Sequence, residues 1–258
     1  PAELVYFPFP QAPSSTYFGS STNGLASGST SDEAVLHGLF EVIERDVASF
    51  VRLGMRTRPV DESTLPLRHR RLLETWQERG FDVAVRYAPN PFRLAWLRAT
   101  LWERGSRDPL FINEGTGCHL DREVALSRAL AEAAQSRLTL IHGARDDVRQ
   151  AYDRFAGWSA ARKRRFAEKV LAAARGSPPP MAFQRVPDDR GACASFDNAI
   201  AAVLERLRRA GAPNAFVVPL ADVDASIQVV RVVVPLLEHF AVQAPRIGRR
   251  LADYADVA

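Results

Sequence analysis

The sequence of 258 residues is poor in cysteine and in lysine, and the first shortage already excludes a class of protein. Its two cysteines, Cys118 and Cys193, form no CxxC motif, and no histidine spacing completes a zinc site with them. A secreted disulfide scaffold would need more cysteines, so the sequence indicates a reducing compartment, and we expect a cytoplasmic protein. The sequence assigns no role to Cys118, His37 or His119.

Long apolar runs and the common nucleotide-binding motifs are also missing. No run approaches the roughly 18 to 20 residues of a membrane span, and the N-terminal PAELVYFPFP lacks the basic and apolar regions of a signal peptide. Neither GxxxxGK(S/T) nor GxSxG occurs, and GTGCHL at residues 115–120 opens no dinucleotide-binding unit. The sequence has no initiator methionine at its start, so we expect a processed, trimmed or partial chain.

The net charge of +4 and the pI near 9.4 come almost entirely from arginine, with lysine only at Lys163 and Lys169. The one dense basic cluster, ARKRR at residues 161–165, is not interleaved with aromatic residues as in a nucleic-acid-binding module. We interpret it as a solvated helix face and expect no nucleic-acid partner and no membrane. A nucleic-acid or regulatory module remains one alternative that the basic pI keeps open.

Hydrophobic periodicity predicts helices and strands in an irregular order, which indicates an α+β (mixed α/β) fold forming one domain over residues 1–258. We expect long helices packed on antiparallel or mixed sheets. Strands are predicted at residues 3–7, 81–88, 93–103, 109–113, 214–220 and 227–237, and helices at about 32–54, 68–79, 121–141, 146–155, 159–174 and 196–210.

Burial and turns follow from the same patterns. The strands at residues 81–88 and 93–103 alternate and are expected to be half-buried antiparallel neighbours. The two continuous apolar strands near the C-terminus are expected to be buried on both faces. The Ser-, Thr- and Gly-rich stretch 14–31 is expected to be a loop, and EGTGCHL at residues 114–120 a turn.

The predicted helix at residues 32–54 carries an acidic strip. At about 100° per residue, with Glu33 set at 0°, His37, Glu41 and Glu44 fall near about 40°, 80° and 20°. The apolar side chains of the helix fall on the opposite side, between about 180° and 320°. The strip therefore gathers three carboxylates and a histidine on one narrow face.

Two interpretations of this strip remain open. Thr30 and Glu33 have the spacing of a capping box, and Glu41 and Glu44 then form an ordinary solvated surface. However, like charges three and four residues apart destabilise a helix, and Arg45 is the only basic side chain nearby. The alternative is that the carboxylates bind a divalent cation.

The predicted helix at residues 121–141 carries a second polar strip, with Arg128 at 0°, Glu132 near about 40° and Gln135 near about −20°. Carboxylates on one strip and arginine on another suit Mg²⁺ together with phosphate, which Arg45, Arg128 and Arg137 are placed to grip. Four alanines make this helix thin enough for another backbone or a ligand to approach closely: Ala125, Ala129, Ala133 and Ala134.

Three segments, in order and across almost the whole chain, resemble the YcaO-domain family. SSTNGLASGSTSDEAVLHGLFEVIERD at residues 20–46 resembles the first core motif of the family. GTGCHLDREVALSRALAEAAQSR at residues 115–137, with HGARDD at 142–147, resembles the second. VVRVVVPLLE at residues 229–238 resembles the strand near the family's C-terminal end.

This resemblance implies a fold that binds ATP and Mg²⁺ through clustered glutamates, without a Walker loop. Ser29 and Glu33 match the S-x3-E element of the family, Glu41 and Glu44 match E-x2-E, and the later Glu/Gln element falls on helix 121–141. The implied metal ligands are Glu41, Glu44 and Glu132. The nucleotide-binding residues that we expect are Ser29, Glu33, Arg45, Arg128, Glu132, Gln135 and Arg137, and catalytic residues stay unknown.

The resemblance also implies a reaction, in which ATP phosphorylates the oxygen of a peptide backbone amide, a nucleophile adds and phosphate leaves. A neighbouring Cys, Ser or Thr side chain gives an azoline, and an external sulfide gives a thioamide. Azoline-forming members often end in a PxPxP tail, whereas this chain ends in RRLADYADVA. We therefore expect thioamide formation rather than azoline formation, with a TfuA-like partner protein.

Two further departures bear on the site. Fewer residues precede the first core motif than in the family, so we expect part of the usual N-terminal region to be missing. Leu236 stands where the family has a glycine. We see no winged-helix domain, so a separate leader-peptide-binding partner is expected to deliver the peptide or protein substrate, and family precedent admits a homodimer. A non-catalytic relative that binds a peptide or a partner is the second hypothesis.

Overall fold

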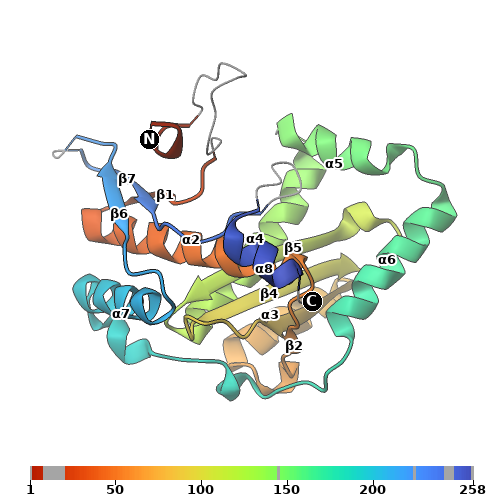
Figure 1. The fold of residues 1–258 in the computed structure, drawn as a ribbon. Coiled ribbons are helices and arrows are strands. Elements are labelled where there is room, and N and C mark those ends of the chain that lie inside the picture. The colour runs from red at the N-terminus through yellow and green to blue at the C-terminus, as the bar shows by residue number, and fades with distance from the viewer. Residues whose placement is uncertain (1, 8–20, 144–145, 223–224, 241–246, 257–258) are drawn as a thin grey trace. The chain divides into compact units, whose positions relative to one another are not determined.

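The computed structural model describes residues 2–7, 21–143, 146–222, 225–240 and 247–256 (Figure 1). The chain divides into two compact units. Unit 1 comprises Pro1–Met55, Asn90–Arg93 and Asp189–Ala258, and unit 2 comprises Arg56–Pro89 and Leu94–Asp188. The expectation of a single domain with part of its N-terminal region missing stays a prediction.

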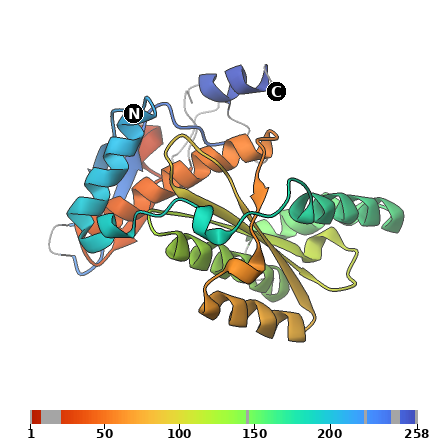
Figure 2. The same cartoon turned by 90° about the horizontal axis from the view of Figure 1, so that it is seen from below.

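Unit 2 is built on a four-stranded antiparallel sheet in the order β2-β3-β4-β5 (Figures 1 and 2). The predicted pairing of the two alternating segments is confirmed, and Val83 on one strand lies opposite Leu101 on the other. The strands are β2 (Arg58–Pro59), β3 (Phe81–Tyr87), β4 (Ala95–Glu103) and β5 (Ile112–His119).

Helices cover both faces of this sheet. Helices α3 (Leu67–Glu78) and α4 (Arg122–His142) share the larger core with alternate residues of β3 and β4. Helix α6 (Ala160–Arg175) packs Leu171 against Trp102 in a second core. The prediction that β3 and β4 are half-buried is therefore wrong, because α6 covers the face that alternation assigns to solvent.

The start of β5 also differs from expectation. Residues 109–113 are predicted as one strand, but Pro109–Phe111 form a 3-10 turn and β5 begins at Ile112. The following EGTGCHL is not a turn, because its residues up to His119 continue β5. Helix α5 (Asp146–Ala156) follows α4, as the sequence predicts.

Unit 1 packs the long helix α2 (Ser31–Arg52) against a three-stranded antiparallel sheet in the order β1-β7-β6. The pairing sets Leu25 of β1 opposite Arg231 of β7. Helix α7 (Phe196–Arg209) also packs on α2, as α8 (Arg249–Ala255) does. The strands are β1 (Leu25–Gly28), β6 (Phe216–Pro219) and β7 (Gln228–Val233).

Helix α2 starts where its sequence dictates and lies close to the sheet. The Thr30 hydroxyl accepts a hydrogen bond from the Glu33 N–H at 3.2 Å and caps the first turn. Gly38 lets the helix approach β7, because a Cβ atom there would lie 2.5 Å from a methyl group of Val232. The apolar side of the helix, which includes Leu39 and Ile43, is buried as the periodicity predicts.

Three expectations for unit 1 are wrong. Residues 3–7 are predicted as a strand, but Ala2–Val5 form the short helix α1. The strand at 214–220 is not buried on both faces, because β6 is an edge strand on which Phe216 is 55% exposed. The stretch 14–31, expected to be a loop, contains β1, although its residues 14–20 lie outside the described part of the chain.

Among the helices that the structure describes, none combines the length and the hydrophobicity that a membrane crossing requires.

Candidate functional site

The S-x3-E pair is held together at the start of α2. The Glu33 carboxylate accepts hydrogen bonds from the Ser29 hydroxyl at 2.6 Å and from the Ser29 backbone N–H at 2.7 Å. The hydroxyl bond, then the backbone bond, and more weakly the charge of His37 hold the pKa of the Glu33 carboxyl below its ordinary value. Glu33 is therefore an anion that fixes Ser29, in addition to lying in a capped first turn.

Further along α2, the acidic strip departs from a plain solvated surface. Glu41 is partly exposed and lies 3.7 Å from the guanidinium of Arg45. Glu44, in contrast, is only 8% exposed. The His37 ring nitrogen Nδ1 lies 3.2 Å from the carbonyl oxygen of Ser27, which connects the strip to β1. A carboxylate as buried as Glu44 argues against a merely solvated face, because carboxylates are rarely buried without a partner charge or a metal.

Arg231 on β7 organises the segment that leads into this site. Its side chain is 1% exposed, and its guanidinium donates hydrogen bonds to the carbonyl oxygens of Val5, Ser21 and Asn23 at 3.0, 2.8 and 2.6 Å. Burial lowers the pKa of Arg231, and the negative charge of Glu41 opposes that change. Arg231 thus anchors the chain before β1 and carries a positive charge within electrostatic range of Glu41.

Leu236, which the resemblance led us to expect as a glycine, adopts a backbone conformation typical of glycine. Leu236 has a φ of +74°, in the left-handed region that side chains with a Cβ atom avoid. Its side chain is 62% exposed, and its carbonyl oxygen accepts a hydrogen bond from Arg250 at 3.1 Å. Leu236 therefore adopts this turn at the cost of backbone strain.

In unit 2, close backbone packing positions the second polar strip. A Cβ atom at Gly117 of β5 would overlap the carbonyl oxygen of Ala125 on α4, and one at Gly115 would lie 2.7 Å from the carbonyl carbon of Glu132. The thin helix predicted from the sequence therefore receives another backbone, that of β5. The alanines that face the strand are fully buried: Ala125, Ala129 and Ala133.

Glu132 already has protein partners. Its carboxylate accepts hydrogen bonds from the Thr116 backbone N–H at 2.5 Å and from the Thr116 hydroxyl at 3.2 Å. Arg128 and Gln135 lie on the same strip of α4 and are exposed. Among the described residues, neither of these two side chains makes a hydrogen bond or an ion pair. Both are thus available to a ligand.

Arg137 lies on another side of α4. It follows Arg128 by nine residues, which is about 180° around the helix. Its guanidinium lies 4.6 Å from the centre of the Phe81 ring and 3.3 Å from the carboxylate of Glu103. The structure therefore gives Arg137 a packing role at the paired ends of β3 and β4 and does not bring it to the strip of Glu132.

The residues without an assigned role have structural positions. Cys118 is fully buried on β5. The Nδ1 atom of His119 accepts a hydrogen bond from the Asp121 N–H at 3.0 Å, beside the N-cap of α4. Neither residue lies on the polar strip of α4.

The donor groups suit Mg²⁺ and phosphate in kind. Glu41 and Glu44 offer the hard oxygen ligands that Mg²⁺ prefers, and the fixed hydroxyl of Ser29 and the exposed Arg128 suit phosphate oxygens. Within the described residues, no group of three or more His, Cys, Asp or Glu side chains that could hold a metal ion occurs. Glu132 belongs to unit 2 and the other two glutamates to unit 1, so the three-residue metal set stays a prediction.

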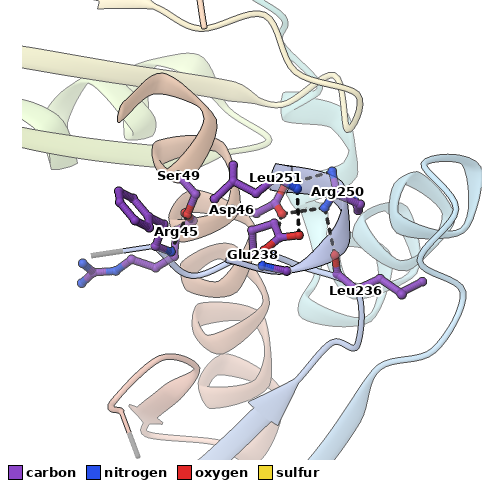
Figure 3. A network of polar contacts seen from close by, with 9 residues as sticks. Arg45, Asp46, Ser49, Leu236, Glu238, Arg250 and Leu251 are labelled. Carbon is purple, nitrogen blue, oxygen red and sulfur yellow. Dashed lines mark hydrogen bonds and ion pairs between the residues drawn. The ribbon is translucent and has the colours of Figure 1, made fainter. Parts of the chain in front are cut away.

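Sequence analysis missed a cluster directly after the E-x2-E pair, in which the buried Asp46 and Glu238 meet the partly exposed Arg250 (Figure 3). Asp46 is 1% exposed, and its carboxylate accepts hydrogen bonds from Arg250 at 2.6 Å and from the Glu238 N–H at 2.7 Å. Burial raises the pKa of Asp46, and the Arg250 charge is the main influence that lowers it. The sequence held a signal, because Asp46 falls at about 220° on the helical wheel, within the apolar stripe.

A sequence model described as YcaO cyclodehydratase, ATP- and Mg²⁺-binding, matches residues 1–238. The chain belongs to the YcaO family. The family description confirms the predicted cofactors, which are ATP and Mg²⁺. The matched range includes all three segments that resemble the family.

Curated relatives of this YcaO chain are longer than the chain itself. An uncharacterised protein of Methanothermobacter thermautotrophicus is 36% identical over 255 residues, which cover 97% of this chain and 64% of that protein. A protein of Rhizobium leguminosarum bv. trifolii, named for its place in the tfuA 3′ region, is 31% identical over 235 residues, which cover 86% and 53%. The chain therefore spans between half and two thirds of these relatives.

The structure of YcaO from Methanopyrus kandleri bound with AMPPCP and Mg²⁺ matches this chain with a TM-score of 0.75 at 22% sequence identity. The match covers 96% of this chain and 64% of that one. At this identity the likeness shows a shared fold. The predicted YcaO-like α+β (mixed α/β) fold is thereby confirmed.

Proposed function

We propose that this chain is the YcaO part of an enzyme that uses ATP and Mg²⁺ to activate a peptide backbone amide for post-translational modification. The observation that carries this proposal is the intact set Ser29, Glu33, Glu41 and Glu44 around one helix, with Ser29 and Glu33 hydrogen-bonded at 2.6 Å. A helix that used these carboxylates only for solubility would leave Glu44 exposed, and Glu44 is buried.

In this proposal, Mg²⁺ is held by Glu41, Glu44 and Glu132. The nucleotide is held by Ser29, Glu33, Arg45, Arg128, Glu132, Gln135 and Arg137. Arg128 and Gln135 are exposed and ready to bind, whereas Arg137 would have to leave Glu103 and the Phe81 ring. We therefore assign Arg137 the smallest share of the binding.

When bound, ATP supplies the phosphoryl group that turns a peptide amide oxygen into a leaving group. The part of the chain itself is to position the reactants and to balance charge. The Glu33 carboxylate fixes the Ser29 hydroxyl, and Arg231 fixes the segment before β1. Glu41 and Glu44 supply the negative charge that attracts the cation.

We further propose that the product is a thioamide rather than an azoline. The support is the relative named for its place in the tfuA 3′ region, together with the resemblance, which implies that thioamide-forming members work with a TfuA-type partner. A TfuA-like protein is thus the proposed partner, and a separate leader-peptide-binding protein the proposed carrier of the substrate. A cytoplasmic location, a homodimer and the lack of a nucleic-acid partner remain predictions from the sequence.

One observation favours a second function, a YcaO-like protein that binds a peptide or partner without catalysis. In the enzymatic proposal, Glu132 binds both the metal and the nucleotide. Its carboxylate already accepts hydrogen bonds from the backbone N–H and the hydroxyl of Thr116. If these side chains only stabilise the fold, the protein does not need to bind ATP. ATP binding separates the two functions directly.

The test is calorimetric titration of ATP into the protein with and without Mg²⁺, for the wild type and for Glu44→Gln. We expect wild-type binding that requires Mg²⁺, and a loss of at least about 10-fold in affinity in Glu44→Gln, because an amide oxygen is a poor substitute for a carboxylate ligand. Asp32→Asn is the matched control, since Asp32 is exposed on the first turn of the same helix.

Equal loss in Asp32→Asn and Glu44→Gln would assign the effect to helix charge and not to ligation. No binding by a folded wild type would overturn the enzymatic proposal for this chain and favour the binding protein.

A further inference from the structure

A network of largely buried polar groups contacts α2 through Asp46 and Ser49 (Figure 3). Asp46 follows Glu44 by two residues, which places it about 200° around the helix. The NH1 atom of Arg250 donates to one carboxylate oxygen of Asp46 at 2.6 Å, and its NH2 atom to the other at 3.4 Å. The tie is therefore bidentate and directional.

Glu238 joins Asp46 to the helix that carries Arg250. The Glu238 backbone N–H donates to Asp46 at 2.7 Å. The Glu238 carboxylate accepts from the N–H groups of Gly248 and Leu251 at 2.8 and 3.1 Å, and so caps the start of α8. Glu238 is 5% exposed and Leu251 is fully buried, so this cap is part of the interior of unit 1.

The same C-terminal segment contacts α2 one turn further on. The Ser49 hydroxyl accepts from the Phe240 N–H at 2.8 Å and donates to the Arg45 carbonyl at 2.7 Å. Arg52 donates to the Phe240 carbonyl at 2.8 Å. On α8, Tyr254 meets the Phe50 ring edge-on at 5.4 Å. The segment thus follows α2 over two turns.

We propose that Asp46 and Arg250 are positioning residues for Glu41 and Glu44, so that docking of α8 sets the affinity of the carboxylate strip for Mg²⁺-ATP. This inference rests on the proposed function. The apolar contacts of α2 with its sheet are non-directional and allow small rotations of the helix. A turn of about 10° moves a carboxylate that lies about 6 Å from the helix axis by about 1 Å, more than a pre-organised site tolerates.

The test compares Arg250→Gln and Asp46→Asn with Arg249→Gln. Arg249 is the matched control, because it lies on the same helix, its side chain is 94% exposed and it pairs with Asp253 at 3.8 Å. Calorimetry with Mg²⁺ and a non-hydrolysable ATP analogue is done well below the melting temperature, with circular dichroism to confirm folding. We expect about 5- to 20-fold weaker binding in each of the first two variants and no change in Arg249→Gln.

The double variant Asp46→Asn/Arg250→Gln gives a readout that a general loss of stability would not reproduce. If the two residues act as one device, the double variant binds as weakly as either single variant. If each merely loosens the fold, the two losses multiply, and the proposal is overturned. Arg250→Lys keeps the charge but not the bidentate geometry, so we expect it to recover only part of the affinity.

Binding of Mg²⁺-ATP by the wild type distinguishes a failure of the proposed function from a failure of the positioning role. A folded wild type that does not bind Mg²⁺-ATP refutes the proposed function, whatever the variants do. A wild type that binds, with a folded Arg250→Gln variant within twofold of it, refutes only the positioning role.

A second measurement on the wild type covers the case in which Arg250→Gln fails to fold. Coupling between two sites is reciprocal, so Mg²⁺-ATP must stabilise α8 if α8 favours binding. We expect the amide protons of Gly248 and Leu251 to exchange with solvent at least about fivefold more slowly in the presence of Mg²⁺-ATP, an effect at the lower end of the usual range of coupling. Unchanged exchange under saturating nucleotide would overturn the inference.

Discussion

Leu236 shows how a single residue stores strain in unit 1. Its φ of +74° costs a residue with a Cβ atom about 1 to 2 kcal/mol relative to glycine, and its exposed side chain returns little of that energy. The conformation persists because the Leu236 carbonyl accepts a hydrogen bond from Arg250 and the backbone N–H of Glu238 donates one to Asp46. These hydrogen bonds to charged side chains therefore offset the backbone strain at Leu236.

We predict that Leu236→Gly raises the free energy of unfolding by about 1 kcal/mol, less than the full strain because glycine also gains entropy in the unfolded chain. Leu236→Ala is the control, since it removes the side chain but keeps the Cβ atom, and it should leave stability nearly unchanged. Urea unfolding at constant pH measures both. A glycine variant no more stable than the alanine variant would show that Leu236 is not strained.

His69 is a second residue whose environment affects a measurable property, the pH dependence of stability. It is 4% exposed on α3, and its Nε2 atom lies 2.9 Å from the hydroxyl of Ser127 on α4. That hydroxyl donates to the Glu123 carbonyl, so it accepts a hydrogen bond from the Nε2–H group of the imidazole. Burial, and next the charge of Arg68, lower the pKa of His69.

The sign of the pH dependence follows from this lowered pKa. The unfolded chain binds a proton at His69 near the ordinary value of 6.5, whereas the folded chain binds it only at lower pH. The stabilisation is thus fully present above the ordinary pKa of 6.5 and is lost as the pH falls below it toward the lower pKa of the folded chain. The loss approaches at most about 1.4 kcal/mol per pH unit for one proton.

We therefore expect urea unfolding to show lower stability at about pH 5.5 than at about pH 7.5, and a smaller difference in His69→Gln, whose amide keeps a donor for Ser127. The exposed His142→Gln should retain the wild-type difference. A pH profile that is the same in all three proteins would contradict a buried neutral His69.

At the scale of elements, the contact between β5 and α4 depends on the absence of side chains. Gly115 and Gly117 of the strand meet buried alanines of the helix, so two backbones lie in van der Waals contact. Glu132 reaches the backbone of Thr116 because the two elements are this close. The position of the second polar strip thus depends on five small residues, the two glycines of β5 and three buried alanines of α4.

We predict that Gly117→Ala destabilises the protein by about 3 kcal/mol, because the new Cβ atom would overlap the carbonyl oxygen of Ala125 on a helix that cannot yield without repacking. Chemical denaturation measures the loss. Gly157→Ala, with no atom within 4 Å of the added Cβ, is the control in the same unit and should stay within about 0.5 kcal/mol of the wild type. Similar losses in both variants would refute the close-packing argument.

Elements with local signals could be predicted from the sequence, and those with distant causes could not. Helices α2, α6 and α7 begin at hydroxyl caps that the sequence displays, namely Thr30, Ser159 and Ser195. Helix α8 has no such cap, because Glu238 supplies it from ten residues away. The prediction of a turn at EGTGCHL is wrong because Gly115 and Gly117 allow α4 to pack closely on the strand. Local sequence rules do not distinguish such glycines from the glycines of a turn.

The same division applies to the candidate site. The strip of Glu33, Glu41 and Glu44 follows from helical periodicity, since neighbours on one helix are fixed by geometry. The engagement of Arg137 with Phe81 and the pairing of Asp46 with Arg250 depend on residues far away in sequence. Such contacts are decided by packing, which periodicity does not encode.

At the scale of the whole molecule, the net charge of +4 is dispersed rather than concentrated. In the described part of the chain, many arginines pair with carboxylates, as Arg175 and Arg104 do with Asp82, and Arg208 and Arg209 with Glu205. Even the basic cluster on α6 has Lys163 within 3.4 Å of Asp108. A basic surface neutralised in this way attracts a phosphate backbone less than the pI alone indicates.

The pairing of β1 with β7 sets Leu25 opposite Arg231, and the Arg231 side chain also holds Val5, 226 residues away. A ribosome that adds about 5 to 20 residues per second needs about 10 to 40 s to reach the partner of a strand it has already released. Unit 2 is encoded between the two halves of unit 1 and emerges complete during that interval. The apolar face of α2 is without β7 throughout that interval, so we expect unit 1 to complete its fold only after β7 has been synthesised.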